Sequence, residues 1–514
     1  MHAPLPGIPY RDRGAGSGWA PAVLVLLVCL LAVVGGLLAG LGSPLLVLPV
    51  VAVIGACVLM FSPTPVWLWA IAVLSLLVVG PTIYFARIES ARWLVPALAL
   101  GMALPALLHI ARPVHLRAEK LGPWPGAFVV LALFLAWAAL STAINRTAPG
   151  DWLGLVRYYL MLLPLILLLG AGALPATHWR WLWLFYAVSA VIQLPVAAVQ
   201  RFVFAARQVR SAEWDAVVGT FPGQAEGGGA SAAMGVYLVI ASVFALMLWR
   251  HGLVRARWAA LIVLSSVATL ALAEVKAVAL LLVLAAVLVF ADQLRRRPIQ
   301  FLLAASVAAV TAVGMLQVYE RTQYDSRSVM GRLQAPRSPW EAIGNQFDPD
   351  ASFSYTGQLG RVASFVHWWE FNVSRGTGVV EPLAGHGASA TQLSRLNVGE
   401  LVGRFRHPLN QTGTGVLLWE VGLAGHLLLV LGLLLAAHLA WRTARRDGPD
   451  AWHRALLKAT AIGLVLMTVT LPYKAFLFST APSQVLLAML LGYAAYASRR
   501  WPSPTRRSAV TQAN

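Results

Sequence analysis

The sequence predicts an all-α polytopic membrane protein, a transmembrane helical bundle of about 14 spans within a range of about 12–14. Of its 514 residues, 59% are hydrophobic and only 11% are charged, and the mean hydropathy is +0.72. An ordinary soluble domain carries about 25% charged residues. The apolar residues form continuous runs of roughly 20, which is the length that crosses a bilayer core. This composition excludes a soluble enzyme, a disordered chain and a collagen-like or disulfide scaffold.

The apolar runs divide the chain into three regions. We expect an N-terminal transmembrane bundle of about 11 spans over 1–318, an external loop bearing short helices over 319–413, and further spans with a cytoplasmic tail over 414–514. Continuous runs rich in Leu, Val and Ala exclude a barrel, because barrel strands alternate over about ten residues. The first run is longer than a signal-peptide core, so we expect a retained anchor. The candidate spans are 20–41, 44–61, 65–86, 92–111, 126–144, 153–174, 180–205, 231–249, 257–275, 277–293, 300–318, 414–440, 454–472 and 480–498.

The basic residues of the short loops predict the orientation. Loops rich in Lys and Arg stay in the cytoplasm, and one assignment with both termini inside fits nearly every short loop. The net charge of +19 is divided between the two membrane faces, so anionic lipid headgroups explain the inner charges and no nucleic-acid partner is expected. The inner loops carry Arg112, Arg117, Lys120, Arg180, Arg250, Arg255, Arg257, Arg295, Arg296, Arg297, Arg442, Arg445, Arg446, Arg454, Arg499, Arg500, Arg506 and Arg507.

Two external loops are candidates for a functional surface. The segment 319–413 is long, and loops of more than about 15 residues are usually functional or disordered. Its aromatic run Phe365–Phe371 is typical of an interfacial amphipathic helix. The second loop, roughly 206–230, is Gly-rich and includes Gly219-Thr220-Phe221-Pro222-Gly223.

A few ionisable residues lie where a bilayer makes charge costly, and such residues often mark function. Arg157 lies in the run 153–174, and Glu274 and Lys276 lie at the outer end of 257–275. Residues two apart on a helix do not face each other, so Glu274 and Lys276 need not pair. Lys276 either extends to the interface as a helix-end residue or holds an anionic ligand, and both alternatives remain open.

Further arginines and one histidine lie on the outer side. Arg361, Arg404 and Arg406 belong to the long loop, and Arg210 follows the span 180–205. Each is explained equally well as a surface or interfacial residue, but arginine suits bidentate contact with phosphate oxygens, and their number on one face favours a diphosphate ligand. His407 begins His-Pro-Leu-Asn-Gln-Thr-Gly, where a neutral imidazole either takes a proton from a hydroxyl or has a structural role.

Several other chemistries have no motif in the sequence. There is no HExxH and no His or Cys cluster with metal spacing, so no metal site is predicted. A phosphate-binding loop ending in Lys-Ser or Lys-Thr and a Gly-x-Ser-x-Gly elbow are also absent, so ATP hydrolysis and serine hydrolysis have no support. Cys29 and Cys57 lie in apolar runs and are expected to be small buried thiols.

The chain resembles the O-antigen ligase and polymerase superfamily of bacterial polytopic envelope glycosyltransferases. The resemblance covers most of the chain in layout and is specific over about 210–425. Two positions depart from the family pattern, because Lys276 replaces the usual Arg and Pro408 follows the His where Asn is common. The matching stretches are Gly219–Gly223, Val275-Lys276, Arg361 before Pro382-Leu383-Ala384-Gly385-His386-Gly387, and His407 before Glu420, Gly422 and Gly425.

The resemblance implies a metal-independent glycosyltransferase of the bacterial inner membrane that needs no cofactor. Its donor is a glycan on undecaprenyl diphosphate presented at the periplasmic face, and its acceptor is a hydroxyl of another glycan. Lys276 and Arg361 are expected to hold the diphosphate leaving group, and His407 to orient or deprotonate the acceptor hydroxyl. The expected substrate-binding residues are Arg157, Arg210, Arg404, Arg406 and Glu420.

Four functions remain open from the sequence. The leading one is an O-antigen or exopolysaccharide polymerase, with a flippase and a chain-length regulator as expected partners besides membrane lipids. An O-antigen ligase, or a ligase acting on protein hydroxyls, uses the same donor. A transporter for an anionic lipid or sugar is the alternative from another class, although we find no related halves of the kind transporters often have. A structural anchor for an envelope assembly is the fourth.

Overall fold

The computed structural model describes residues 62–111, 121–145, 149–205, 215–324, 338–350, 352–353, 358–375, 378–392, 398–405 and 407–502. The predicted spans 20–41 and 44–61, with Cys29 and Cys57, lie outside these residues. The described residues from Leu68 onward belong to one compact unit, whereas residues 62–67, with the first turn of helix α3, belong to the other. Within the described residues the fold is all-α, as predicted, apart from one two-stranded ribbon.

Ten described helical segments are long and apolar enough to cross a membrane, and they correspond to ten of the predicted spans. The protein is therefore a multi-pass membrane protein. The segments are α3 (Thr64–Val73) with η1 (Leu74–Val78) and α4 (Val79–Ala86); η2 (Glu89–Trp93) with α5 (Leu94–Gly101) and α6 (Ala103–Ala111); α7 (Gly126–Ile144); α8 (Pro149–Leu155) with η4 (Val156–Leu160) and α9 (Leu163–Gly170); α10 (Ala176–Val199) with η5 (Gln200–Phe204); α11 (Ser231–Arg250); α12 (Ala256–Ala273); α13 (Lys276–Phe290) with η7 (Ala291–Gln293); α14 (Pro298–Gln323); and α20 (Gly422–Ala444).

Three helices complete the C-terminal part. Helices α21 (Ala451–Val469) and α23 (Ala481–Arg500) occupy the predicted spans 454–472 and 480–498, with the short α22 (Phe476–Ser479) between them. Helix α23 is buried along almost its whole length and packs on α9, α20 and α21. Helix α11 is also largely buried and packs on α21. Helices α11, α21 and α23 therefore form the centre of the bundle, and the other described helices surround them.

The run 414–440 was predicted as one continuous span, and the structure breaks it. Helix α19 (Gly413–Glu420) ends at Val421, and α20 begins at Gly422, whose φ of 68° is left-handed. A Cβ atom on Gly422 would lie only 2.2 Å from the carbonyl oxygen of Leu383. The break follows from this close approach of a second backbone, which the local sequence does not reveal.

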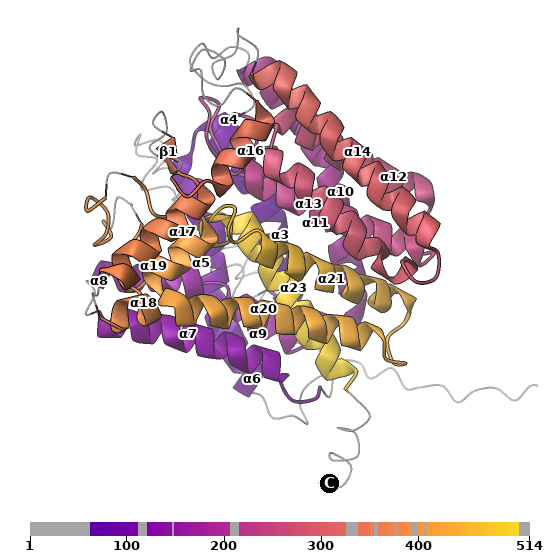
Figure 1. The fold of residues 1–514 in the computed structure, drawn as a ribbon. Helices are drawn as coiled ribbons and strands as arrows, with labels where there is room; N and C mark the ends of the chain where they lie inside the picture. The colour runs from indigo at the N-terminus through magenta and orange to yellow at the C-terminus, as the bar shows by residue number, and fades with distance from the viewer. Residues whose placement is uncertain are drawn as a thin grey trace, which may run out of the picture. The chain divides into compact units, whose positions relative to one another are not determined.

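The segment before α19 forms short elements at one end of the bundle (Figure 1). They are α16 (Pro339–Phe347), β1 (Ser352–Phe353), β2 (Gln358–Leu359), α17 (Arg361–Trp369), η8 (Glu370–Ser374) and α18 (Val380–Ala384); Ser352 pairs with Leu359 in the antiparallel ribbon. The predicted amphipathic helix is present as α17. Trp368 is buried and donates to the carbonyl oxygen of Leu418 at 3.0 Å, whereas Phe365 and Trp369 are exposed.

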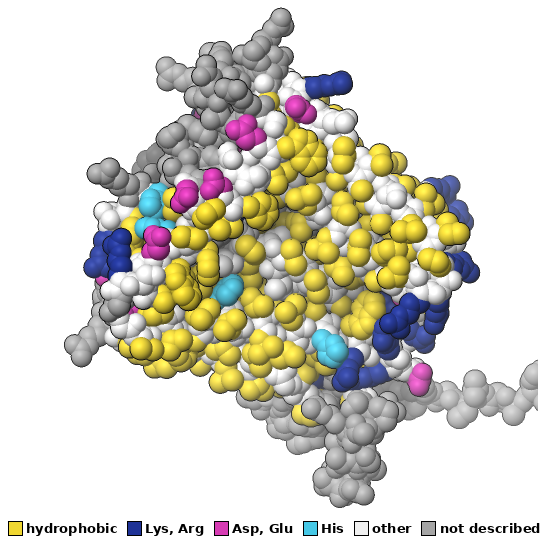
Figure 2. Space-filling model, viewed as in Figure 1, with side chains coloured by type: hydrophobic (Ala, Val, Ile, Leu, Met, Phe, Trp, Pro, Cys, Tyr) yellow, Lys and Arg dark blue, Asp and Glu magenta, His cyan; other side chains and the backbone are white. Residues whose placement is uncertain are grey.

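The surface in Figure 2 has a wide apolar band between two charged margins. Helix α14 contributes exposed Ile299, Leu303 and Val310 to this apolar surface. Exposed aliphatic side chains in a continuous band are the surface that lipid tails cover. Acidic and histidine side chains gather near α16 to α19 with a small group of Lys and Arg beside them, and more Lys and Arg lie toward the opposite side of this view.

Three described spans contain a π-helical turn. These π turns are η1, η4 and η5, and each includes or adjoins residues of the site described below. A π turn inserts one residue into a helix and frees a backbone group, and such turns are frequent at functional sites. The carbonyl of Leu76 in η1 accepts a hydrogen bond from the hydroxyl of Thr220 in the Gly-rich loop. The π turns thus bind distant segments to the end of the bundle.

Candidate functional site

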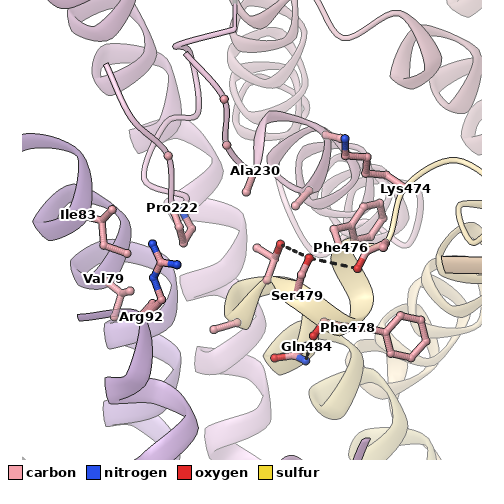
Figure 3. Close-up of a pocket in the computed structure, with 18 of the residues that line it drawn as sticks. Val79, Ile83, Arg92, Pro222, Ala230, Lys474, Phe476, Phe478, Ser479 and Gln484 are labelled. Carbon is pink, nitrogen blue, oxygen red and sulfur yellow. Dashed lines mark hydrogen bonds between the residues drawn. The ribbon is translucent and has the colours of Figure 1, made fainter. Parts of the chain in front are cut away.

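A cavity of about 540 Å³ opens among five segments that are far apart in the sequence. We call it the cationic cavity. Figure 3 shows Arg92 and Lys474 on different walls, with Pro222 and Ala230 of the Gly-rich loop between them. The contributing stretches lie in 79–96, 157–161, 222–233, 408–411 and 474–484.

Positive charge predominates in the wall of this cavity. Among the described residues of its wall, Arg92, Arg157 and Lys474 are the cations and Glu89 is the acid, which gives these residues a net charge of +2. Glu89 forms an ion pair with Arg92 and accepts from the amide of Gln224 at 2.8 Å. An anion in the cavity would therefore meet two cations whose charge the lining does not offset.

Arg157 occupies a central position because it lines two cavities. Its guanidinium lies 4.0 Å from the ring centroid of Trp93 and 5.1 Å from that of Tyr158. Cation–π contacts of this kind hold an arginine in place without neutralising its charge. Arg157 is thus kept available for an anionic ligand, and it is the only one of the eight site residues predicted from the sequence that lines the cationic cavity in the described part of the chain.

Arg361 lies beside the cationic cavity rather than in its lining. It is the first residue of α17, and its guanidinium lies 5.7 Å from the ring centroid of Tyr473, the residue before Lys474. Burial, and next the positive charge of Arg361, lower the pKa of Lys474, whereas Asp215 acts in the opposite direction. Burial also lowers the pKa of Arg361, but a guanidinium remains charged at physiological pH. Arg361 therefore adds to the positive potential of the cavity from behind its wall.

His407 is followed directly by cavity residues, because Pro408, Asn410 and Gln411 line the wall. Its ring centroid lies 4.7 Å from that of His367 on α17. The Nε2 atoms of both histidines are buried and have no hydrogen-bond partner among the described residues. Burial lowers the pKa of His407, and burial followed by the charge of His407 lowers that of His367. Both rings are therefore neutral near pH 7, and an unprotonated Nε2 is able to accept a proton.

Lys276 lies apart from the cationic cavity. It is the first residue of α13, and its Nζ atom lies 5.0 Å from the ring centroid of Tyr324. Glu274, two residues earlier, forms a buried ion pair with Arg201 at 3.0 Å. The sequence predicted one cleft for Lys276, Arg361 and His407; in the structure each contacts a different aromatic ring, and none of the three lines the cavity.

Two glutamines of one helix hold the Gly-rich loop. The Gln193 amide exchanges two hydrogen bonds with Thr220, each of 2.7 Å. Gln200 accepts from the backbone N–H groups of Val218 and Gly219 and donates to the carbonyl of Gly219 at 2.7 Å. Both glutamines are fully buried, so these bonds replace water that the backbone would otherwise need. The loop that lines the cavity is therefore rigidly attached to α10 and η5.

Replacing Gln200 with Ala is expected to destabilise the protein. The substitution leaves three buried backbone groups without their partner, and each such group costs about 1–3 kcal/mol. The thermal unfolding midpoint in detergent is the measurement, and Gln224→Ala, which removes one exposed bond to Glu89, is the control. Equal midpoints for the two variants would contradict the role of Gln200 as an anchor.

Glu420 is fully buried at the break between α19 and α20. Its carboxylate accepts from the hydroxyl of Tyr159 at 2.7 Å, from that of Thr391 at 2.6 Å and from the amide of Gln392 at 3.1 Å. The predicted role in substrate binding is not reflected in the cavity lining, which lacks Glu420. Because Tyr159 belongs to η4, these bonds instead position the turn that carries Arg157.

The stretch Pro382–Gly387 packs against the stretch that begins at Glu420, and both were compared with the family pattern above. The N–H groups of His386 and Gly387 donate to the carbonyls of Trp419 and Glu420 at 2.8 and 2.9 Å. A Cβ atom on Gly385 would lie 2.6 Å from the carbonyl carbon of Glu420. Because Gly385 has no side chain, the two backbones are able to approach this closely, which explains why glycine occupies this position.

A second cavity of about 420 Å³ adjoins the first, and we call it the apolar cavity. The two cavities share Arg157, Met161, Phe478 and Gln484. From this shared boundary the apolar cavity follows α7 and α9 to Phe128 and Leu167. Ten residues of helix rise about 15 Å, so the apolar cavity extends far along the helices from its polar neighbour.

The remaining predicted residues lie elsewhere. Arg404 is exposed and forms a 3.7 Å ion pair with Glu400, and Arg210 and Arg406 lie outside the described residues. Sequence reasoning missed Arg92, Lys474, His367 and Gln200 as contributors. A signal existed for Gln200, because an amide within a long apolar run needs a partner. For Arg92 and Lys474, which occupy helix ends and loops, ordinary interfacial arginine and lysine residues look the same in the sequence.

Comparison with known proteins does not identify the chain. No family model matches it, and no curated protein matches it in sequence.

Proposed function

We propose that the protein transfers a glycan from a polyprenyl diphosphate carrier to a sugar hydroxyl. The observation that supports this function is the junction of the cationic and apolar cavities at Arg157. A polyprenyl diphosphate has an anionic head joined to a long apolar chain. The cationic cavity suits the anionic head and the adjoining apolar cavity suits the apolar chain, with Arg157 at the boundary between them.

The head and tail of such a donor have different requirements. Arg157 and Lys474 contact the diphosphate oxygens, and Arg361 contributes positive potential from behind the wall. Fixed positive charge in a cavity of low dielectric stabilises the charge that develops on a leaving group. The first prenyl units lie between α7 and α9, where Phe134 and Leu163 line the apolar cavity. Lys276 contacts Tyr324 at a separate place, so we assign it no contact with the diphosphate.

The reaction requires one bond to form and one to break. The acceptor hydroxyl oxygen attacks the anomeric carbon of the donor sugar, and the bond from that carbon to the diphosphate oxygen breaks. The electron pair of this bond leaves with the polyprenyl diphosphate. His407 accepts the hydroxyl proton on Nε2 and later releases it to water. General-base assistance of this kind contributes about 10²–10⁴-fold to the rate.

We assign the cavity to the periplasmic face of the inner membrane on the distribution of basic loop residues. The donor is then undecaprenyl diphosphate carrying the growing glycan, and the acceptor is another repeat unit, which makes the protein a polymerase. A deletion strain separates the polymerase from the ligase. Single repeats still attached to their final acceptor support the polymerase, whereas free carrier-linked polymer supports the ligase.

Purified full-length protein in proteoliposomes provides the direct test. A labelled carrier-linked repeat is added, and products are separated by length. Longer carrier-linked chains together with released undecaprenyl diphosphate are expected. Movement of the label across the bilayer without any new glycosidic bond would instead show a transporter and overturn the proposal.

Filling the apolar cavity is expected to discriminate between carriers of different chain length. Ala132 lines this cavity and is exposed to it, so Ala132→Trp fills space with little effect on the packed core. The KM for a carrier of natural length is expected to rise about tenfold, and the KM for a two-prenyl analogue to stay unchanged. Leu133→Trp is the matched control, because Leu133 is the next residue of α7 and lies outside the lining. Equal effects on both carriers would place the prenyl chain elsewhere.

A further inference from the structure

A third cavity, of about 230 Å³, lies where the start of α7 meets the ends of α20 and α23. We call it the basic cavity. Its lining includes Arg442, Arg446 and Arg499, and none of the described residues that line it is Asp or Glu. We propose that the basic cavity binds the phosphate headgroup of an anionic membrane phospholipid. This site is distinct from the cationic cavity and plays no part in the proposed transfer reaction.

Two of the arginines are held in fixed positions by backbone carbonyls. Arg499 donates from Nε to the carbonyl of Gly122 and from Nη1 to that of Gly170, both at 2.7 Å. Its guanidinium also lies 4.6 Å from the ring centroid of Trp124. Arg446 donates from Nη1 to the carbonyl of Trp501. Guanidinium groups fixed in this way lose little further freedom when an anion arrives, which favours binding.

The beginning of α7 adds a second source of positive potential. Helix α7 has 19 residues and no side-chain cap, and the cavity is lined by Pro125, Gly126 and Ala127 at its start. The first N–H groups of a helix have no partner within it and form the positive end of the helix dipole. A Cβ atom on Gly126 would meet nothing within 4 Å, so the backbone there is open to the cavity.

The apolar surroundings favour a lipid over a soluble anion. Helices α7 and α20 lie side by side (Figure 1). Leu435 and Leu439 line the basic cavity, and Leu427, Leu431 and Leu434 of the same helix are exposed. The volume is below the roughly 300 Å³ of the smallest sites for whole drug-sized ligands, so it holds a headgroup and leaves the acyl chains outside. The exposed leucines provide the surface that these chains cover.

The location agrees with an inner-leaflet lipid. The arginine-rich ends of α20 and α23 are on the predicted cytoplasmic side, and basic pockets between spans on that side are suited to anionic headgroups. An alternative explanation is that the arginines only stabilise the C-terminal ends of α20 and α23, where cations are favourable. That role predicts no preference among lipids, so binding measurements separate the two.

The test measures lipid binding to the purified full-length protein by native mass spectrometry. The probes are phosphatidylglycerol, phosphatidylcholine and inorganic phosphate. The variants are Arg442→Gln and Arg442→Glu, because Arg442 is exposed and its loss spares the carbonyl bonds of Arg446 and Arg499. The matched controls are Arg295→Gln and Arg295→Glu, in an exposed loop on the same predicted face.

We expect phosphatidylglycerol to bind more tightly than phosphatidylcholine, and Arg442→Glu to weaken its binding about tenfold. Arg442→Gln is expected to have a smaller effect in the same direction, and the Arg295 variants to bind as the wild type does. Equal binding by the Arg442 and Arg295 variants, or no preference for phosphatidylglycerol, would overturn the proposal. Inorganic phosphate that competes fully with the lipid would show a general anion site and would also overturn it.

Discussion

Arg157→Gln is expected to lower kcat/KM for glycan transfer by about 10²–10³-fold, which is the loss seen when one preorganised stabiliser of transition-state charge is removed. Arg157 has the central place in the proposal, because its guanidinium lies where the cationic and apolar cavities meet. Glutamine keeps much of the side-chain length but loses the charge. The measurement is the initial rate of chain extension by the reconstituted protein at several donor concentrations.

Arg404→Gln provides a matched control for the loss of charge. Arg404 is exposed and its ion pair with Glu400 is 3.7 Å long, so we expect a rate close to that of the wild type. Lys474→Gln is expected to resemble Arg157→Gln, because Lys474 also lines the cationic cavity. If both cavity variants retained full activity, the diphosphate would not bind in the cationic cavity.

His407→Ala is expected to reduce kcat by about 10²–10⁴-fold while leaving donor binding measurable. His407 lies outside the lining but directly before Pro408, and its buried Nε2 atom has no hydrogen-bond partner among the described residues. Single-turnover rates and donor binding are measured separately on the same preparation. His386→Ala is the control, because the His386 ring is already bound to Asn372 at 2.9 Å. Full activity of the His407 variant would exclude His407 from the proton transfer.

The pH dependence follows from the direction of the His407 shift. Burial lowers the pKa of His407 below its usual value of about 6.5, so the neutral ring that accepts a proton predominates at and above that pH. Activity is therefore expected to stay constant down to about pH 6.5 and to fall only as the pH drops through the lowered pKa. Burial opposes the protonation of His407 in the folded protein but not in the unfolded chain. The free energy of unfolding is therefore also expected to decrease as the pH falls below about 6.5. An activity loss that is complete above pH 7 would contradict this assignment.

His367 is the residue whose ring lies beside that of His407. Burial, and next the charge of His407, lower the pKa of His367, and the two rings are 4.7 Å apart. His367 follows Arg361 by six residues on α17, so one short helix carries the cation behind the cavity wall and the ring beside His407. The position of α17 is therefore important both for the positive potential that Arg361 contributes and for the proton transfer proposed for His407.

The span pattern could be predicted closely from the sequence. Nine of the ten described helical segments match predicted runs within about four residues at each end, since length and hydropathy determine which segments partition into a bilayer. The amphipathic helix at Phe365–Phe371 was also recognised, because helical periodicity is a local property. The break at Val421 was missed, since it depends on the backbone of Leu383–Gly385 reaching Gly422.

The candidate site could be predicted only in part. Arg157 was found because a charge within an apolar run is conspicuous, and it does line the cavity. Lys276 was expected beside Arg361 and His407, but its Nζ contacts Tyr324 while the cavity is formed without it. Arg92 and Lys474 were not selected, since interfacial cations are common and nothing local distinguishes those that converge.

The amino-acid sequence thus determined that this is a multi-pass helical membrane protein, because hydropathy acts over each run of residues by itself. The tertiary structure alone decided which cations share a cavity and that an apolar cavity adjoins it at Arg157. Convergence depends on how helices separated by hundreds of residues pack together. That packing depends on contacts such as that of Glu420 with Tyr159, 261 residues earlier in the chain, which no single stretch of sequence contains.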